Sequence, residues 1–156
     1  MISRKLLAAS AALVSVSLLS GCTAAGKDAP TSKIHQVTDG VERDSGAVKV
    51  RDFLLIPQAD GSAVLVGTVV NQDPTADAIS SISVKSVPGK LTGTLALEQN
   101  TPVIFSGDSA NAHASFPGVN LVPGERTDVT ITFGKAAGLT FSAIVREKSD
   151  IYANVA

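Results

Sequence analysis

Alternating apolar and polar residues dominate the chain from Ala47 onward. Short apolar-rich runs are separated by Gly, Pro, Asp or Asn, a pattern typical of strands joined by turns. The alternation is clearest in TDVTITF, where Val129, Ile131 and Phe133 are predicted to point inward between outward threonines. The run LTFSAIV, Leu139–Val145, repeats it. The pattern therefore predicts a β-rich body.

Earlier runs predict further strands. Val48, Val50, Leu54 and Ile56 are expected to share one face of a strand. The run AVLVGTVVN, 63–71, is apolar on both faces and is predicted to lie centrally, covered on both sides. Additional strands are expected at ISSISV, at LTGTLAL, at residues 103–105 and at residues 150–155, whereas SGDSANAHASFPG is expected to be a long loop.

These runs together predict the fold class. About seven to nine short strands, with turns about every 8 to 12 residues, are typical of two antiparallel sheets packed face to face. We expect an all-β, antiparallel β-sandwich, immunoglobulin-like or cupredoxin-like, that forms a single domain over residues 46–156; a barrel is the alternative. Because the chain has no Trp and one Cys, the core must consist of aliphatic residues and phenylalanines.

The first residues follow a different pattern. Arg4 and Lys5 precede the uncharged run LLAASAALVSVSLLS, and a basic region followed by an apolar one is typical of an export signal. A transmembrane helix needs about 20 predominantly apolar residues, and this run is shorter and diluted by serines. It predicts a signal peptide over residues 1–21.

The predicted signal ends at Leu19, Ser20, Gly21 and Cys22. This tetrapeptide resembles the lipobox of bacterial lipoproteins. The resemblance implies that the Cys22 thiol is joined to diacylglycerol and that the chain is then cut before this residue. Acyl chains of the palmitate type would anchor the protein to the extracytoplasmic face of the cell membrane, since two or more chains hold far more firmly than one.

Residues 22–45 are predicted to be a polar tether. The segment TAAGKDAPTSK is small, polar and interrupted by Gly26 and Pro30, so it cannot bury enough apolar surface to offset the entropy of ordering. A short edge strand at Ile34–Val37 remains an open alternative within this segment.

Charge and motifs exclude two partner classes. Without residues 1–21 the chain keeps 11 of its 13 Lys and Arg against 14 Asp and Glu, a net charge of −3. Such a dispersed, slightly acidic balance predicts no nucleic-acid binding. No phosphate-cradling glycine motif occurs, so no nucleotide is expected either.

The candidate catalytic chemistry is sparse. Residues Gly107-Asp108-Ser109 resemble the Gly-Asp-Ser block of a lipolytic hydrolase family, but the later Asp-x-x-His of that family is absent. A serine nucleophile needs an oriented base, and His113 lies only four residues on. We therefore interpret the block as a turn, predict no catalytic residue and expect a non-enzyme.

The candidate metal ligands are equally few. His113 in the expected loop, or His35 in the tether, is a single ligand, whereas a metal site needs three or four. Asp73 and Asp77 lack the spacing of a calcium loop and are interpreted as solvated turn charges. No metal site and no cofactor are predicted.

The order of segments resembles one known family. A lipobox and tether are followed by VRDFLLIPQADGSAVLVGTVVNQ and later by VPGERTDVTITFGKAAGLTFSAIVRE. With the landmarks Asn71-Gln72 and Pro123-Gly124, this order resembles actinobacterial lipoproteins of the LpqE type, which are related to the cupredoxin-like periplasmic copper chaperones called PCuAC. The likeness spans about residues 46–150.

The resemblance implies a fold but not a copper site. PCuAC chaperones hold Cu(I) with two histidines and two methionines, one His placed two residues before a Met, since such soft ligands suit this ion. This chain has no His-x-Met, and its single methionine is Met1. No copper ligand can therefore be transferred from the family.

We expect a non-enzymatic, lipid-anchored protein of the cell envelope. Its partners are the membrane, through Cys22, and a protein or an envelope glycan or lipid that loops such as Ser106–Pro117 bind. The alternative is a metallochaperone-like protein that handles copper or another metal. A hydrolase dependent on Ser109 is the third hypothesis.

Overall fold

The computed structural model describes residues 39–156. The predicted signal peptide, the lipobox with Cys22 and the open alternative of a strand at Ile34–Val37 lie outside the described residues. Within the described part, no helix is long and apolar enough to cross a membrane.

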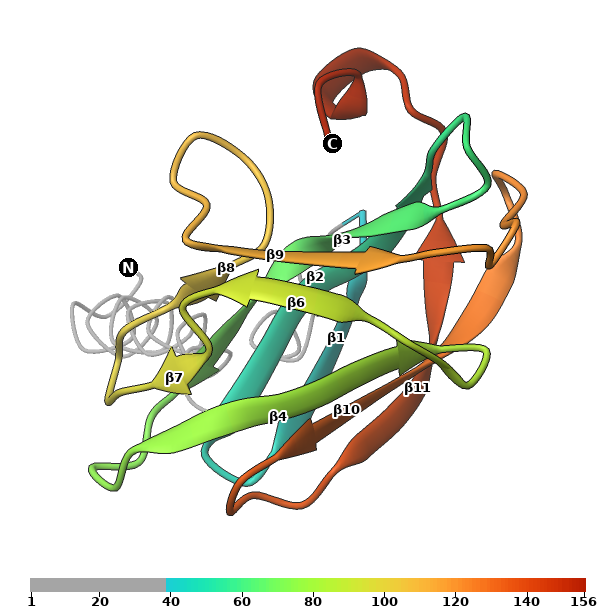
Figure 1. The fold of residues 1–156 in the computed structure, drawn as a ribbon. Coiled ribbons are helices and arrows are strands. Elements are labelled where there is room, and N and C mark those ends of the chain that lie inside the picture. Colours follow the sequence, from blue (N-terminus) through green and yellow to red (C-terminus); the bar gives the residue numbers. More distant parts are fainter. Residues whose placement is uncertain (1–38) are drawn as a thin grey trace, which may run out of the picture. The chain divides into compact units, whose positions relative to one another are not determined.

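The described part is built almost entirely of strands (Figure 1). Eight strands have at least four residues, a number within the predicted seven to nine: β1 (Val41–Ser45), β2 (Val48–Pro57), β3 (Ala63–Asn71), β4 (Asp77–Val84), β6 (Lys90–Gly93), β9 (Ala112–Phe116), β10 (Arg126–Phe133) and β11 (Leu139–Val145). Three have two residues each: β5 (Val87–Pro88), β7 (Ala96–Leu97) and β8 (Val103–Ile104). A 3₁₀ helix, η3 (Asp150–Tyr152), follows them.

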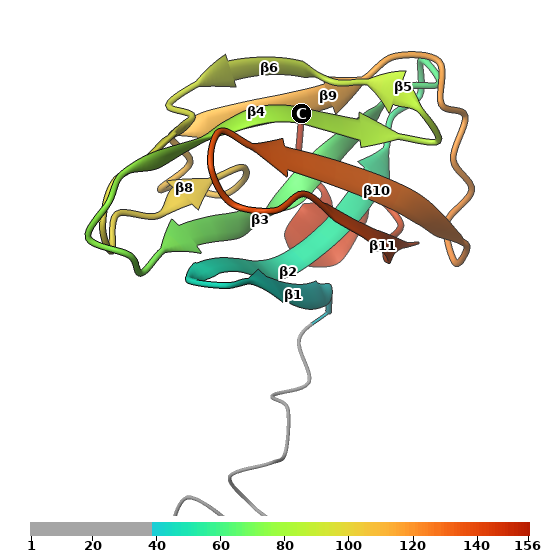
Figure 2. The ribbon, with the colours of Figure 1, turned by 90° about the horizontal axis from the view of Figure 1, so that it is seen from below.

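The strands form one continuous hydrogen-bonded path that folds back on itself. Its order is β5-β4-β10-β11-β2-β3-β9-β6, with β1 beside β2, β7 beside β4 and β8 beside β3. In Figure 2, β4, β5 and β6 lie along one side and β1 and β2 along the other. The predicted all-β sandwich is confirmed, with one addition: β11 and β2 run parallel where Ile144 pairs with Leu54 and Val145 with Leu55.

The main core lies between the two layers. The predicted inward residues of β10, namely Val129, Ile131 and Phe133, are buried, and the alternate residues of β11 are buried from Phe141 to Val145. The largest side chains with almost no exposure are Phe53, Phe105, Phe116, Leu54, Leu55, Ile56, Leu65, Ile82, Leu97 and Ile131.

A β-bulge in β2 changes which residues share a face. Asp52 adopts a φ of 54°, and the pairing with β3 shifts between Arg51 and Leu54. An extra residue in one strand reverses the alternation beyond it. Val50 therefore lies in the main core, while Leu54 and Ile56 lie in a second cluster. The prediction that these three residues share one face is wrong.

The second cluster covers the other face of β2 and β3. Leu54, Ile56 and Val64 pack there with Val155 from the end of the chain. This burial covers the second face of β3 at Val64 and partly at Val66, so the prediction that β3 is covered on both sides is confirmed only for the first half of the strand. The strand predicted at residues 150–155 is wrong, because η3 and a turn occupy this segment.

The predicted long loop contains a strand. β9 occupies Ala112–Phe116 and pairs with β6 on one side and with β3 on the other. Its buried positions include Ala112 and Ala114, and such small residues give little apolar signal in the sequence. The expected loop of Ser106–Pro117 is therefore shorter than predicted.

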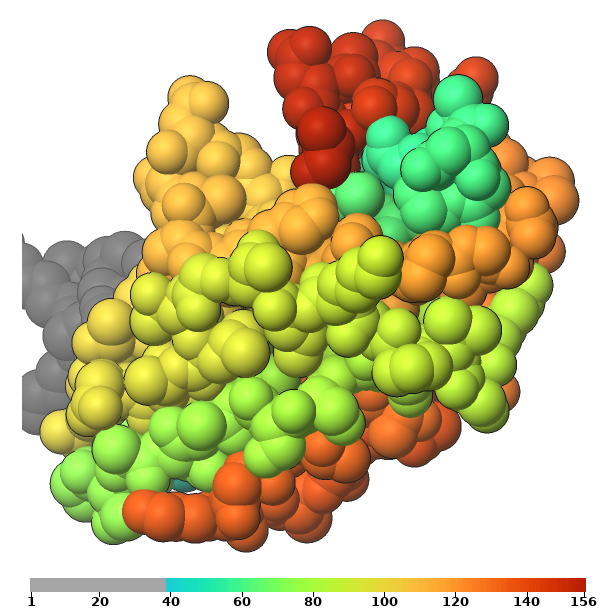
Figure 3. Space-filling model, viewed as in Figure 1, coloured from blue at the N-terminus to red at the C-terminus, as the bar shows by residue number. Residues whose placement is uncertain are grey.

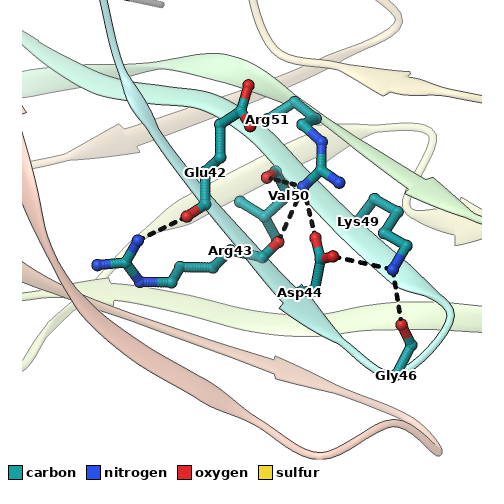
Figure 4. Close-up of polar contacts among 7 residues, drawn as sticks. All are labelled: Glu42, Arg43, Asp44, Gly46, Lys49, Val50 and Arg51. Carbon is teal, nitrogen blue, oxygen red and sulfur yellow. Dashed lines mark hydrogen bonds and ion pairs between the residues drawn. The ribbon is translucent and has the colours of Figure 1, made fainter. Parts of the chain in front are cut away.

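The first strand lies in the segment predicted to be tether. β1 pairs with β2 ahead of Gly46, the predicted start of the body. Figure 4 shows how charged side chains link the two strands: Arg51 and Lys49 contact the Asp44 carboxylate at 2.6 and 2.9 Å. The hydrogen bond from Arg51 is the main reason that the pKa of Asp44 lies below its ordinary value. These exposed pairs fix the hairpin geometry more than they add stability.

Candidate functional site

A cleft of about 470 Å³ lies between the loop after β8 and the C-terminal segment. Figure 3 shows the hollow between the protruding loop (amber) and the C-terminal segment (red). We call it the His113 cleft. Its lining residues are Thr92, Gly93, Phe105, Ser106, Gly107, Ala110, Asn111, Ala112, His113, Asn154, Val155 and Ala156.

Two paired strands supply one wall of the His113 cleft. Thr92 of β6 lies directly opposite His113 of β9 in the antiparallel register, so the two side chains stand on the same face, with Cβ atoms about 5 Å apart. The imidazole is partly buried and the threonine is exposed. The pairing therefore presents a hydroxyl and an imidazole side by side.

The loop wall is held by the side chain of Asn111. Its Oδ1 accepts a hydrogen bond from the Ile104 amide at 2.8 Å, and its Nδ2 donates to the Pro102 carbonyl at 2.9 Å. Gly107 takes a φ of 92°, and its carbonyl accepts from the Ala110 amide at 3.0 Å. Asn111 therefore ties the end of the loop to β8, and the bond between Gly107 and Ala110 closes a turn within the loop.

The C-terminal wall is held by Val155 and Tyr152. Val155 is buried in the second cluster, and its carbonyl accepts a hydrogen bond from Gln58 at 3.4 Å. The Tyr152 hydroxyl donates to the Asp39 carboxylate at 3.1 Å. Burial, and then the Asp39 carboxylate, raise the pKa of Tyr152 to about 12, so its hydroxyl keeps its proton at physiological pH.

Within residues 39–156, no Asp, Glu, Lys or Arg side chain lines the His113 cleft. Its polar side chains are Thr92, Ser106, Asn111, His113 and Asn154. Among the described residues, no group of three or more His, Cys, Asp or Glu side chains is arranged to hold a metal ion. A single imidazole does not fit the two-histidine, two-methionine ligand set that the family resemblance implies for copper.

The predicted candidates separate in the structure. His113 lines the cleft but belongs to β9 rather than to a loop, whereas Ser109 is an exposed residue of the loop and is not part of the lining. Sequence reasoning missed Thr92, Asn154 and Val155, since no local pattern indicates that distant segments converge here. His35 and Cys22 lie outside the described residues.

Asp77 has a structural role that the sequence did not reveal. One carboxylate oxygen accepts hydrogen bonds from the Ala78 and Lys135 amides, both at 2.8 Å, and the other accepts from the Ala136 amide at 2.9 Å. Burial alone would raise the pKa of Asp77, but these amides outweigh it and lower the value. Asp77 is therefore not simply a solvated turn charge, while Asp73 does serve its own turn by accepting from the Thr75 amide.

The fold is similar to that of solved PCuAC domains. The apo PCuAC domain from PmoF1 has a TM-score of 0.61 at 20% identity, covering 69% of this chain and 99% of that chain. The copper-bound PCuAC domain from PmoF2 has a TM-score of 0.59 at 18% identity, covering 69% of this chain and 98% of that chain. The apo PmoF2 domain has a TM-score of 0.59 at 17% identity, covering 70% and 98%.

This likeness establishes a PCuAC-like fold, and identities this low carry no function with them. No protein-family model matches the chain, and no curated protein sequence matches it. The narrower resemblance to LpqE-type lipoproteins remains a prediction.

Proposed function

We propose that this chain is a lipid-anchored, extracytoplasmic binding protein that captures a component of the cell envelope in the His113 cleft. The observation that carries the proposal is the cleft itself, in which two strands, a loop held by Asn111 and the C-terminal segment bring together several polar side chains. Small-molecule sites commonly combine such a preformed hollow with a few polar groups.

The proposed activity is binding without catalysis. Acyl transfer requires a nucleophile within hydrogen-bond reach of an oriented base. Of Ser109 and His113, the two residues considered above, only His113 lines the cleft. No hydrogen bond among the described residues orients its imidazole. Among the described lining residues there is also no Asp or Glu side chain that could orient it.

The anchor is tested in the native host. Replacement of Cys22 by alanine should abolish acylation and the cleavage that follows it, because Cys22 is the only thiol of the sequence. Radiolabelled palmitate should appear on the wild-type chain and not on Cys22→Ala. Palmitate on the Cys22→Ala chain, or its absence from the wild-type chain, would contradict the anchor.

The cleft is tested by crosslinking in intact cells. A photoreactive residue in place of Ala110, which lines the cleft, should capture an envelope component. The same residue in place of the exposed Thr140 of β11 is the matched control, because it lies outside the lining. Filling the hollow with His113→Trp should abolish the Ala110 crosslink. A crosslink that survives this substitution would contradict binding in the cleft.

Metal handling is the second candidate function. The comparisons favour it, since the fold is shared with PCuAC domains and one of these is copper-bound. The available ligands argue against metal handling, because the described residues place no second metal-binding side chain beside His113. A metal delivered as cargo would then have one protein ligand here.

A copper titration separates the two functions. Both core clusters lie within residues 41–155, so the anchor-free chain, residues 23–156, retains the whole folded body. We expect no tight stoichiometric binding of Cu(I) or Cu(II) to it. Tight binding that disappears in His113→Ala would establish the metal function and overturn the first proposal.

A further inference from the structure

We infer that the His113 cleft takes a neutral saccharide of the cell envelope. This inference rests on the proposed function and names its ligand class. The described lining residues include one imidazole and no Asp, Glu, Lys or Arg side chain, and this composition favours some classes of ligand over others.

The described side chains of this cleft offer a charged ligand no complementary Asp, Glu, Lys or Arg. A phosphate or carboxylate is normally held by Arg or Lys, and neither occurs in the lining. A hard cation is held by carboxylates and carbonyls, and no Asp or Glu side chain lines the cleft. Transfer of a charged group from water into such a site costs free energy, and no oppositely charged side chain of the described lining offsets that cost.

The polar groups of the lining match hydroxyl-rich ligands. Four side chains each offer both a hydrogen-bond donor and an acceptor: Thr92, Ser106, His113 and Asn154. For the imidazole, the tautomer decides which nitrogen donates and which accepts. None of these four side chains forms a hydrogen bond within the described part of the chain. Asn111 differs, because both of its polar atoms are bonded to the backbone. A sugar hydroxyl both donates and accepts, so it can pair with any of the four.

The size and floor of the cleft also suit a sugar. Its volume of about 470 Å³ lies within the range of roughly 300–1,000 Å³ that is common for small-molecule sites. The exposed Ala110 contributes apolar surface against which the C–H face of a pyranose can pack, whereas Ala112 and Val155 are only 6% and 9% exposed. Phe105 is only 2% exposed, so its ring is part of the floor and not a platform for stacking.

A second surface of the molecule supplies the matched control. The outer face of β4 and β10 also carries hydroxyls, and those of Ser81 and Thr132 lie 2.7 Å apart. This face is open and its hydroxyls bond to each other, as is usual for the solvent side of an antiparallel sheet. Ser81→Ala therefore removes a hydroxyl of the same kind without altering the cleft.

The test is an NMR titration of the anchor-free chain. Diacetylchitobiose, galactobiose and arabinobiose serve as neutral probes, and inorganic phosphate and Ca²⁺ serve as charged ones. We expect at least one neutral probe to give saturable shifts at Thr92, His113 and Asn154. Thr92→Ala and Asn154→Ala should each weaken that binding about tenfold, the loss of one hydrogen bond, while Ser81→Ala should leave it unchanged.

Three outcomes would overturn the inference: no binding by any neutral probe, saturable binding of phosphate or Ca²⁺ in the cleft, or shifts that lie elsewhere. If the Ala110 crosslink in cells persists while every saccharide fails, the ligand class is wrong and the binding function stands. If that crosslink also fails, the proposed function falls with it. Because Thr92 and Asn154 are exposed, their variants are expected to fold, which circular dichroism checks.

Discussion

Thr127 of β10 is buried in the sheet, and its hydroxyl has no hydrogen-bond partner among the described residues. An unsatisfied buried polar group costs about 1–3 kcal/mol. Thr127→Val replaces the hydroxyl by a methyl group of similar shape, so we expect the free energy of unfolding to rise by about 1 kcal/mol. Urea denaturation of the anchor-free chain measures it.

The matched control for this prediction is Thr127→Ser. It keeps the unsatisfied hydroxyl and removes the methyl group, so it should lower the free energy of unfolding by about 1 kcal/mol. If the valine variant were also less stable than the wild type, the hydroxyl would have a partner such as a buried water, and the argument would fail.

Asp52 combines an unusual backbone conformation with an unfavourable charge. It has a φ of 54°, and its Oδ1 accepts the Gly40 amide at 2.7 Å. Burial, and then the nearby Asp39 and Glu42, raise its pKa above the ordinary 3.8. Because the pKa of Asp52 is higher in the folded state than in the unfolded state, the protonated carboxyl favours folding. This stabilisation is fully present below pH 3.8 and is lost as the pH rises through the folded-state pKa. At pH 7 the ionised carboxylate therefore costs stability.

The variant Asp52→Asn should relieve that cost. Asparagine keeps an acceptor oxygen for Gly40 and tolerates positive φ, but it carries no charge. We expect a higher melting temperature than wild type at pH 7 and a difference that shrinks towards zero at pH 3. Melting curves at the two pH values measure the difference, and an equal gap at both would show that charge is not the cause.

Among the elements, the turn between β10 and β11 depends on a residue at the start of β4. Asp77 accepts three backbone hydrogen bonds, two of them from Lys135 and Ala136 in that turn. Asp77→Ala should lower the free energy of unfolding by about 2 kcal/mol, since bonds to a charged acceptor are the stronger ones. Asp73→Ala, which affects only a local turn, should cost less.

The pH dependence of this element provides a second measurement. The pKa of Asp77 is lowered in the fold, so its contribution is complete above the unfolded value and is lost as the pH falls through the folded one. The stability gap between wild type and Asp77→Ala should therefore narrow in acid. A gap that stays constant down to pH 2 would contradict the role of the carboxylate.

The sequence predicts elements well where local alternation matches the final burial. β10 and β11 meet this condition, since every second residue from Val129 and from Phe141 is buried. β2 does not, because the bulge at Asp52 reverses the alternation with no residue that marks it. β9 escaped prediction since its buried residues Ala112 and Ala114 are too small to give an apolar pattern.

For the whole molecule, the candidate site is less predictable than the fold. His113 could be singled out from the sequence because histidine is rare in this chain. Its neighbours in the cleft come from β6, from the loop after β8 and from the last residues. Long-range pairing brings these segments together, and a single sequence carries no signal for it. The apolar pattern of the sequence therefore predicts the β-strand architecture, but it does not predict which residues form the His113 cleft.

The two core clusters also differ in size, which has a consequence for the cleft. Among residues 39–156, the main core holds 25 buried residues, while the second cluster holds four, including Val155. Segments with few buried contacts open at lower free energy than the whole fold. The C-terminal wall of the cleft should therefore open locally while the sandwich stays folded.

Val155→Ala tests this directly. The loss of two methyl groups should weaken the docking of the tail by about 1.5 kcal/mol, which raises amide exchange about tenfold at Tyr152 and Val155. The urea midpoint should change little, because the main core is untouched. Since only molecules with a docked tail present the complete cleft, ligand affinity should fall in proportion to the docked fraction. Equal exchange rates in both proteins, or a matching drop in global stability, would show that the tail and the sandwich unfold as one unit.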